Sequence, residues 1–248
     1  MNMIQTLRAL GPIDIRSIRR DSMLSWMVFV PILSALILRF GLPPLSARLL
    51  ERYEFDLVPF YPALLAYFFV VMSPIVFSVV IGFLLLDEKD DKTLTALQVT
   101  PLSLNTYLAY RIAIPVVLTF VMMFIIFPLS TLDDLPPLHI LLTATAAAPL
   151  APMFALYLAS IAQNKVQGFA LMKLSGAILF VPIFAFFGDY GAWELLFGII
   201  PTYWPMKTYA LLTSGQTECV WFYLLVAVVY QSAVMWLFGR RFNRQMTM

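Results

Sequence analysis

The sequence predicts an all-α protein that crosses a membrane six times, and two observations lead to that class: its composition and the length of its apolar runs. Of the 248 residues, 61% are hydrophobic and 12% are charged, and the mean hydropathy is +0.86. A soluble domain has about 45–50% apolar and about 25% charged residues, so this chain lacks the charge that a soluble surface or a disordered chain requires. The apolar runs are long and unbroken, unlike the short alternating strands of an outer-membrane barrel.

Residues 1–21 form the first predicted element, an amphipathic helix at the membrane interface. Ile4, Leu7 and Leu10 share one helical face, and Ile13, Ile15 and Ile18 continue the apolar contacts beyond an expected break at Gly11-Pro12. Arginines at 16, 19 and 20 lie beside them, which is typical of a helix on a membrane surface.

Six apolar runs follow, each long enough for a spanning helix, which needs roughly 20 apolar residues. The predicted spans cover residues 22–40, 60–86, 105–130, 138–162, 166–187 and 220–238. No loop is long enough for a further folded domain, so we expect residues 1–248 to form one transmembrane domain.

The basic residues of the loops predict the orientation, because cytoplasmic loops carry an excess of lysine and arginine. One side of the membrane holds Arg8, Arg16, Arg19, Arg20, Lys89, Lys92, Arg111, Lys165, Arg240, Arg241 and Arg244. The other side holds Arg39, Arg48, Arg52 and Lys207. Both termini are therefore expected in the cytoplasm.

Two segments between the spans are unusual. Residues 188–218 are too long for a turn and too apolar for a solvated loop, and they predict two short re-entrant helices. An interfacial aromatic belt is the alternative, and the two interpretations do not exclude each other. In residues 87–103, Asp87 is expected to cap a short helix, Leu94 and Leu97 share a face, and Thr100-Pro101 ends it. Such a helix lies between two long spans, so a force that displaces it would tilt both of them. An ordinary solvated loop is the alternative.

Residues 86–103, followed by Tyr107-Leu108 and Arg111, resemble the coupling segment of ABC-2 type ABC transporter permeases. The shared features are an acidic and basic run, Thr93-Leu94, a second leucine at 97, Thr100-Pro101, and a basic residue in span three. This chain has Lys92 where the family usually has glycine, which leaves the start of the helix open. The run 96–103 is similar to the fluoroquinolone-type drug-export branch.

The resemblance implies a permease subunit of an ATP-driven exporter in the cytoplasmic (inner) membrane of a prokaryote. The chain has no phosphate-binding GxxxxGK[ST] loop. ATP and Mg would therefore be bound by a separate ATPase subunit, with no cofactor in this chain, and two permease subunits would pair. The implied ATPase-coupling residues are Glu88, Asp90, Asp91, Thr93, Leu94, Leu97, Gln98, Pro101, Asn164 and Lys165.

Methionine and aromatic side chains in the spans are candidates for lining a lipophilic pathway, because such surfaces adapt to varied apolar ligands. The candidates are Met27, Phe29, Phe68, Met72, Phe77, Met122, Met123, Phe180 and Phe184. Packing against lipid or another helix is the alternative for each of them. The expected substrate is hydrophobic or amphipathic, either drug-like or lipid-like.

Two other function classes compete with an exporter. An ion-coupled transporter or channel usually places ionisable residues deep in its spans, where only Lys173 comes near. A membrane-embedded enzyme needs paired carboxylates, a nucleophile with a base, or a metal cluster, and the lone His139 supplies none of these. No basic tail suits nucleic acid.

Overall fold

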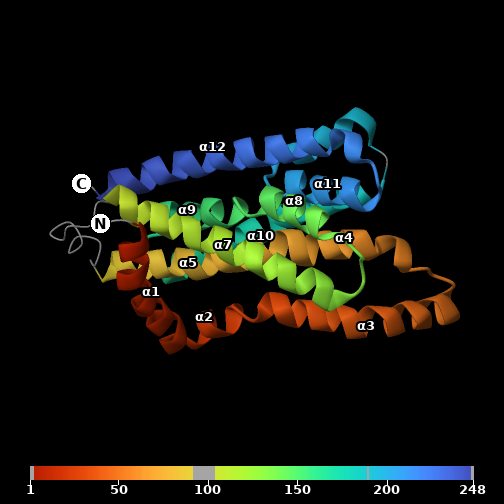
Figure 1. Cartoon of the computed structure of the whole chain (residues 1–248), viewed down its shortest axis with the longest axis horizontal. Coiled ribbons are helices and arrows are strands. Elements are labelled where there is room, and N and C mark those ends of the chain that lie inside the picture. The colour runs from red at the N-terminus through yellow and green to blue at the C-terminus, as the bar shows by residue number, and fades with distance from the viewer. Residues whose placement is uncertain (1–2, 92–103, 189, 247–248) are drawn as a thin grey trace.

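The computed structural model describes residues 3–91, 104–188 and 190–246. Within these ranges every regular element is helical, and six segments are long and apolar enough to cross a membrane, which confirms the predicted fold class. The six segments are Val30–Tyr53, Val58–Asp90, Thr106–Ser130, Pro137–Ile161, Lys165–Phe186 and Thr217–Gln245. They run side by side along one axis, and both termini lie at the same end of the bundle, hereafter the terminal end (Figure 1).

The N-terminal helix α1 (Met3–Arg20) runs across the terminal end rather than along the bundle (Figure 1). It is continuous through Pro12, so the expected break at Gly11-Pro12 is wrong. The Asp21 carboxylate then caps α2 (Ser22–Met27) by accepting hydrogen bonds from the backbone N–H groups of Met23 (3.0 Å) and Leu24 (3.2 Å).

The first membrane-length helix is α3 (Val30–Tyr53), whereas hydropathy predicted residues 22–40. Its start is set by Pro31, which lacks a backbone N–H and is favoured in the first helical turn. The helix also ends later than the predicted residue 40, and the cause is again local. Helical structure continues past the apolar stretch until Glu54 adopts a left-handed conformation (φ 53°).

The second segment is the most buried of the six. It consists of η1 (Val58–Phe60), α4 (Tyr61–Leu65), the π-helical turn η2 (Ala66–Val71) and α5 (Met72–Asp90). Because α5 continues to Asp90, Asp87 lies inside a helix and does not cap a new one as expected. Residues 92–103, which hold most of the predicted coupling segment, lie outside the described residues.

Four spans follow α5. They are α7 (Leu104–Ser130), α8 (Pro137–Ala147) with α9 (Leu150–Ile161), α10 (Lys165–Phe180) with the 3₁₀ turn η3 (Val181–Phe186), and α12 (Val220–Met246). Of these four spans, three pack against α5, and α12 packs against α9. Helix α5 packs closely on α9, where a Cβ at Gly82 would lie 3.2 Å from Leu158 Cδ1. Small residues at such crossings let helix backbones approach within the membrane.

The segment between α10 and α12 lies at the opposite end of the bundle. It contains η4 (Gly191–Ile199), α11 (Tyr203–Thr213) and η5 (Thr217–Cys219). Helix α11 is packed into the protein, and Tyr209 donates a 2.6 Å hydrogen bond to Asp133. Glu194 of η4 pairs with Lys207 of α11 at 2.6 Å.

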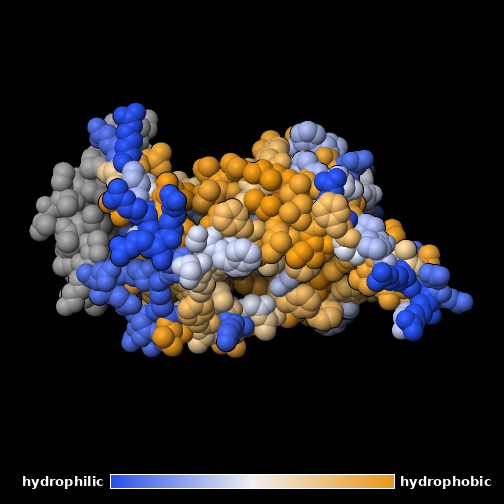
Figure 2. Space-filling model, turned by 90° about the horizontal axis from the view of Figure 1, so that it is seen from below, coloured by the Kyte–Doolittle hydropathy of each residue, from blue (hydrophilic) through white to orange (hydrophobic). Residues whose placement is uncertain are grey.

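Figure 2 shows the face that carries α1 and α3, with an apolar band between two hydrophilic ends. This distribution is typical of a protein whose middle lies in hydrocarbon and whose ends lie in water. The chain is therefore a multi-pass membrane protein, with α1 at the hydrophilic margin of the apolar band.

Candidate functional site

A buried charge cluster joins three helices at the terminal end. Arg111 on α7 has a side chain that is only 1% exposed. Its Nη1 donates to Asp14 Oδ2 on α1 at 2.8 Å, its Nη2 donates to Glu88 Oε1 on α5, and its Nε donates to the Tyr107 hydroxyl at 3.1 Å. A buried charge is tolerated only when it is paired and hydrogen-bonded, as this guanidinium is.

Two tyrosines of α7 complete this cluster. The Tyr107 hydroxyl donates to Glu88 Oε2, and the Tyr110 hydroxyl donates to Asp14 Oδ2 at 2.7 Å. Positions 107, 110 and 111 share one helical face because they are three and four residues apart. We call Asp14, Glu88, Tyr107, Tyr110 and Arg111 the Arg111 cluster.

Neighbouring Asp87 connects the same helix end to a different part of the protein. Its Oδ2 pairs with Lys165 Nζ at the start of α10 at 2.9 Å, and Lys165 also pairs with Asp21 Oδ2 at 2.9 Å. The hydrogen bond from Lys165, reinforced by the N–H groups at the start of α2, lowers the pKa of the Asp21 carboxyl below its ordinary value. Asp21 therefore both caps α2 and ties it to α10.

Lys89 makes the third connection. Its Nζ donates to the Ala162 carbonyl at the end of α9 (3.3 Å) and to Gln245 Oε1 near the end of α12 (3.1 Å). Gln245 in turn donates to the Ser160 carbonyl at 2.9 Å.

Asp87, Glu88 and Lys89 are consecutive, and we call them the anchor residues. Successive residues on a helix point about 100° apart, so three in a row reach three directions. Directly or through one further side chain, the anchor residues contact α1, α2, α7, α9, α10 and α12. They are followed within three residues by the segment 92–103.

The predicted coupling residues fall into three groups. Asp90 and Asp91 are exposed at the end of α5, and Asn164 is exposed where it caps α10 by accepting from Gln167 N–H at 3.0 Å. Glu88 and Lys165 form ion pairs with other helices of this chain, so their side chains hold those helices together. Outside the described residues lie Thr93, Leu94, Leu97, Gln98 and Pro101.

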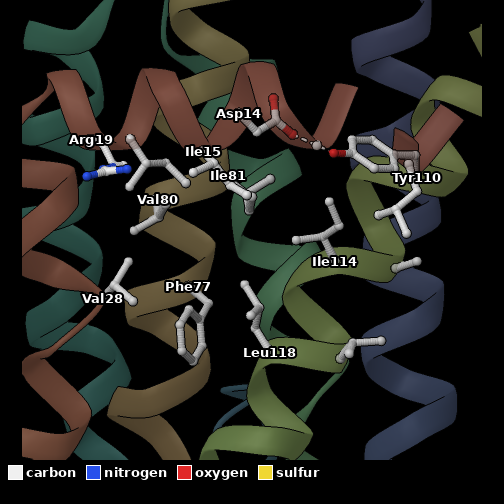
Figure 3. Close-up of a pocket in the computed structure, with 15 residues that line it drawn as sticks. Asp14, Ile15, Arg19, Val28, Phe77, Val80, Ile81, Tyr110, Ile114 and Leu118 are labelled. Carbon is white, nitrogen blue, oxygen red and sulfur yellow. Dashed lines mark hydrogen bonds between the residues drawn. The ribbon is translucent and has the colours of Figure 1, made fainter. Parts of the chain in front are cut away.

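An apolar cavity of about 630 Å³ lies between α1, α5, α7 and the turn before α3 (Figure 3). Two members of the Arg111 cluster, Asp14 and Tyr110, form part of its wall. Leu7, Ile15 and Val117 line it while remaining exposed, so the cavity opens to the surface. The lining residues are Leu7, Gly11, Asp14, Ile15, Ile18, Arg19, Val28, Phe77, Val80, Ile81, Tyr110, Ala113, Ile114, Val117 and Leu118.

The predicted pathway residues are brought together only in part, because Phe68, Phe77, Met122 and Met123 share one apolar core and the others do not. Phe77 lines the cavity. Of the others, Met122, Met123 and the partly buried Phe68 belong to one apolar core, Met27 packs against another, Met72 is partly buried, and Phe29, Phe180 and Phe184 are exposed. Lys173 is exposed on α10, and no ion pair to it is found among the described residues.

Sequence reasoning missed the Arg111 cluster and most of the cavity wall. One signal was available: Leu7, Gly11, Asp14 and Ile18 follow one another at helical spacing, which places an acidic side chain on the apolar face of α1. An acid at such a position needs a buried cationic partner. Arg111, which the sequence places on the cytoplasmic side and in the motif that resembles the coupling segment, is that partner.

Comparisons with known proteins relate nearly the whole chain to export permeases. A family profile described as "Fluoroquinolones export permease protein Rv2686c-like" matches residues 14–239. The Fluoroquinolones export permease proteins Rv2686c and MT2760 of two Mycobacterium tuberculosis strains are each 33% identical over 243 residues, covering 96% of this chain and 94% of each relative. No solved structure matches. The chain therefore belongs to the Rv2686c-like family of fluoroquinolones export permease proteins.

Proposed function

We propose that this chain is the membrane-spanning subunit of an ATP-driven exporter of the ABC-2 type, located in the inner membrane of a prokaryote. It would move amphipathic drug-like molecules, with fluoroquinolones as the first candidates because its relatives are named for their export. A separate ATPase subunit would bind ATP and Mg and dock at the terminal end. Two permease subunits would form the complete membrane channel.

The arrangement of the anchor residues carries this proposal. A force applied to residues 92–103 acts on the end of α5, which is connected to six other helices by ion pairs and hydrogen bonds, either directly or through one further side chain. Because α5 is also the most buried span, its displacement must repack the bundle around it. An ATPase that binds differently to two such arrangements would shift the equilibrium between them.

Apolar side chains on the outer spans provide surface for lipid and for a second permease subunit. Helix α10 exposes Leu174, Ile178 and Phe180, and α12 exposes Trp221, Phe222 and Leu225. Exposed apolar side chains are ordinary where a span faces lipid, and a second subunit would cover part of the same surface.

Capture of the ATPase tests the proposed docking. The permease is co-expressed with a candidate ATPase encoded by a neighbouring gene, purified, and assayed for retained ATPase subunit. We expect Leu94→Arg combined with Leu97→Arg to abolish retention, because two charges would replace the apolar face that the sequence predicts for the coupling segment. The matched control is Leu50→Arg combined with Val58→Arg, which alters two exposed apolar residues at the opposite end and should retain the ATPase.

Loss of retention in both double variants would show general damage rather than a docking face. Failure of the wild type to retain any candidate ATPase would contradict the proposal and favour an ion-coupled transporter.

A further inference from the structure

We infer that the cavity beneath α1 is the binding site for the exported amphipathic molecule, and that Arg19 at the cavity margin holds the carboxylate of that molecule. The inference deepens the proposed function and rests on it for the direction of transport. The described residues place the cavity at the margin of the apolar band, where a molecule dissolved in the bilayer interface meets α1.

The size and lining of the cavity fit a drug-sized apolar body. Its volume of about 630 Å³ lies within the range of roughly 300–1,000 Å³ found for small-molecule sites. Figure 3 shows aliphatic side chains of α1, α5 and α7 facing the same space, with Phe77 and Leu118 on the side away from α1. Such a surface supplies apolar contact without fixing one orientation, which suits a site that accepts related compounds.

Charged side chains at the margin of the cavity determine which polar group of the ligand can bind there. Arg19 lines the cavity on one side, while Asp14 and Tyr110 lie on the other (Figure 3). Arg19 is exposed and forms no ion pair with any described residue, and the nearest acid in sequence, Asp21, is engaged by Lys165. A guanidinium matches a carboxylate in shape and charge, so Arg19 is placed to hold an anionic group while the ring body enters the apolar space.

A chain of hydrogen bonds also connects the cavity wall to the end of α5, which precedes the coupling segment. Tyr110 donates to Asp14, Asp14 accepts from Arg111, and Arg111 donates to Glu88, one of the anchor residues. A ligand that moves α1 away from α7 must strain or break the Asp14 contacts. Asp14 therefore acts as a positioning residue between the cavity and the end of α5.

A fluorescence titration of the full-length permease in nanodiscs, with ciprofloxacin as the probe, tests the site without any ATPase. We expect Val117→Trp to weaken binding by about tenfold or more, because the indole occupies the cavity. Val121→Trp is the matched control, since Val121 lies one turn further along α7, is 52% exposed against 59% for Val117, and does not line the cavity.

A second pair of variants tests the carboxylate. Arg19→Gln should weaken ciprofloxacin binding by about two- to fivefold, the size expected for an exposed ion pair, and should not change binding of a decarboxylated analogue. Arg16→Gln, on the same helix but outside the cavity wall, should leave both affinities unchanged.

Three results would overturn the inference. The first is the absence of saturable binding by the wild type, and the second is equal affinities for the two tryptophan variants. The third is that phosphatidylglycerol is retained by the wild type but not by Val117→Trp, and that drug binding is lost in nanodiscs of that lipid. The last would identify a phospholipid as the occupant. Because the titration uses the permease alone, its failure is separate from a failure to capture an ATPase.

Discussion

Arg111 is the most consequential single residue of the described protein, because one guanidinium satisfies two acids and one tyrosine. Its bidentate, fork-like geometry explains the choice of arginine over lysine, which presents a compact point charge. Apolar side chains of similar volume would stabilise this position at least as well, because burying charged groups costs desolvation energy and buried ion pairs are weak sources of stability. We attribute its presence to the need for a joint between α1, α5 and α7.

Removing the guanidinium should be costly, because two buried acids lose their partner. We expect Arg111→Met to lower the free energy of unfolding by about 3–5 kcal/mol, measured by thermal or denaturant unfolding in detergent. Arg8→Met, an exposed arginine on α1, is the control and should change stability little. A triple variant with Asp14→Leu, Glu88→Met and Arg111→Met should recover much of the stability yet lose the transport that the proposed ATPase would drive. Full transport by the triple variant would contradict the role of the cluster as a joint.

At the scale of single elements, α10 packs against α5 through a position that admits no side chain. A Cβ at Gly168 would lie 2.8 Å from Phe83 Cε1 and 2.9 Å from Leu86 Cδ1. This close crossing holds the start of α10, and with it Lys165, beside the anchor residues. The glycine therefore contributes to the site although it makes no polar contact.

We expect Gly168→Ala to destabilise the protein by about 1–3 kcal/mol, because the added methyl group must displace two packed side chains. Gly176→Ala on the same helix is the matched control. No atom lies within 4 Å of a Cβ at that position, so alanine should be neutral or slightly stabilising. Equal unfolding midpoints for the two variants would show that α10 shifts freely on α5.

Hydropathy predicted the existence of the six spans, because each is a local property of about 20 residues. It placed the first span at 22–40, although the membrane-length helix is Val30–Tyr53. A proline rather than hydropathy sets the helix start, and the helix continues beyond residue 40 through a stretch that mixes apolar, polar and proline residues. The continuity of α1 through Pro12 was also missed. Prolines inside helices cost stability that tertiary contacts offset, and those contacts have no local signal.

At the scale of the whole molecule, the structure places both termini at one end of the bundle, and the excess of basic residues predicts that this end faces the cytoplasm. The only cysteine, Cys219, provides a test because it is exposed and precedes α12, which begins at the opposite end.

A membrane-impermeant maleimide should therefore label Cys219 in intact spheroplasts. In the Cys219→Ser background, Arg8→Cys should be labelled only after the membrane is opened, because α1 lies at the terminal end. Labelling is detected by the mass shift of the purified chain. The reverse pattern would show that the protein is inserted in the opposite orientation.

The class of protein, the number of its spans and the basic character of one side were determined by the sequence alone, because each depends on composition within short windows. Only the tertiary structure decided that Asp14, Glu88 and Arg111 meet in one buried cluster and that a cavity lies beside them. These side chains are separated by 23 to 97 positions along the chain, and the packing of α1 across α5 and α7 brings them together. Pairing over such distances is a property of helix packing, which no local pattern of hydropathy or charge records.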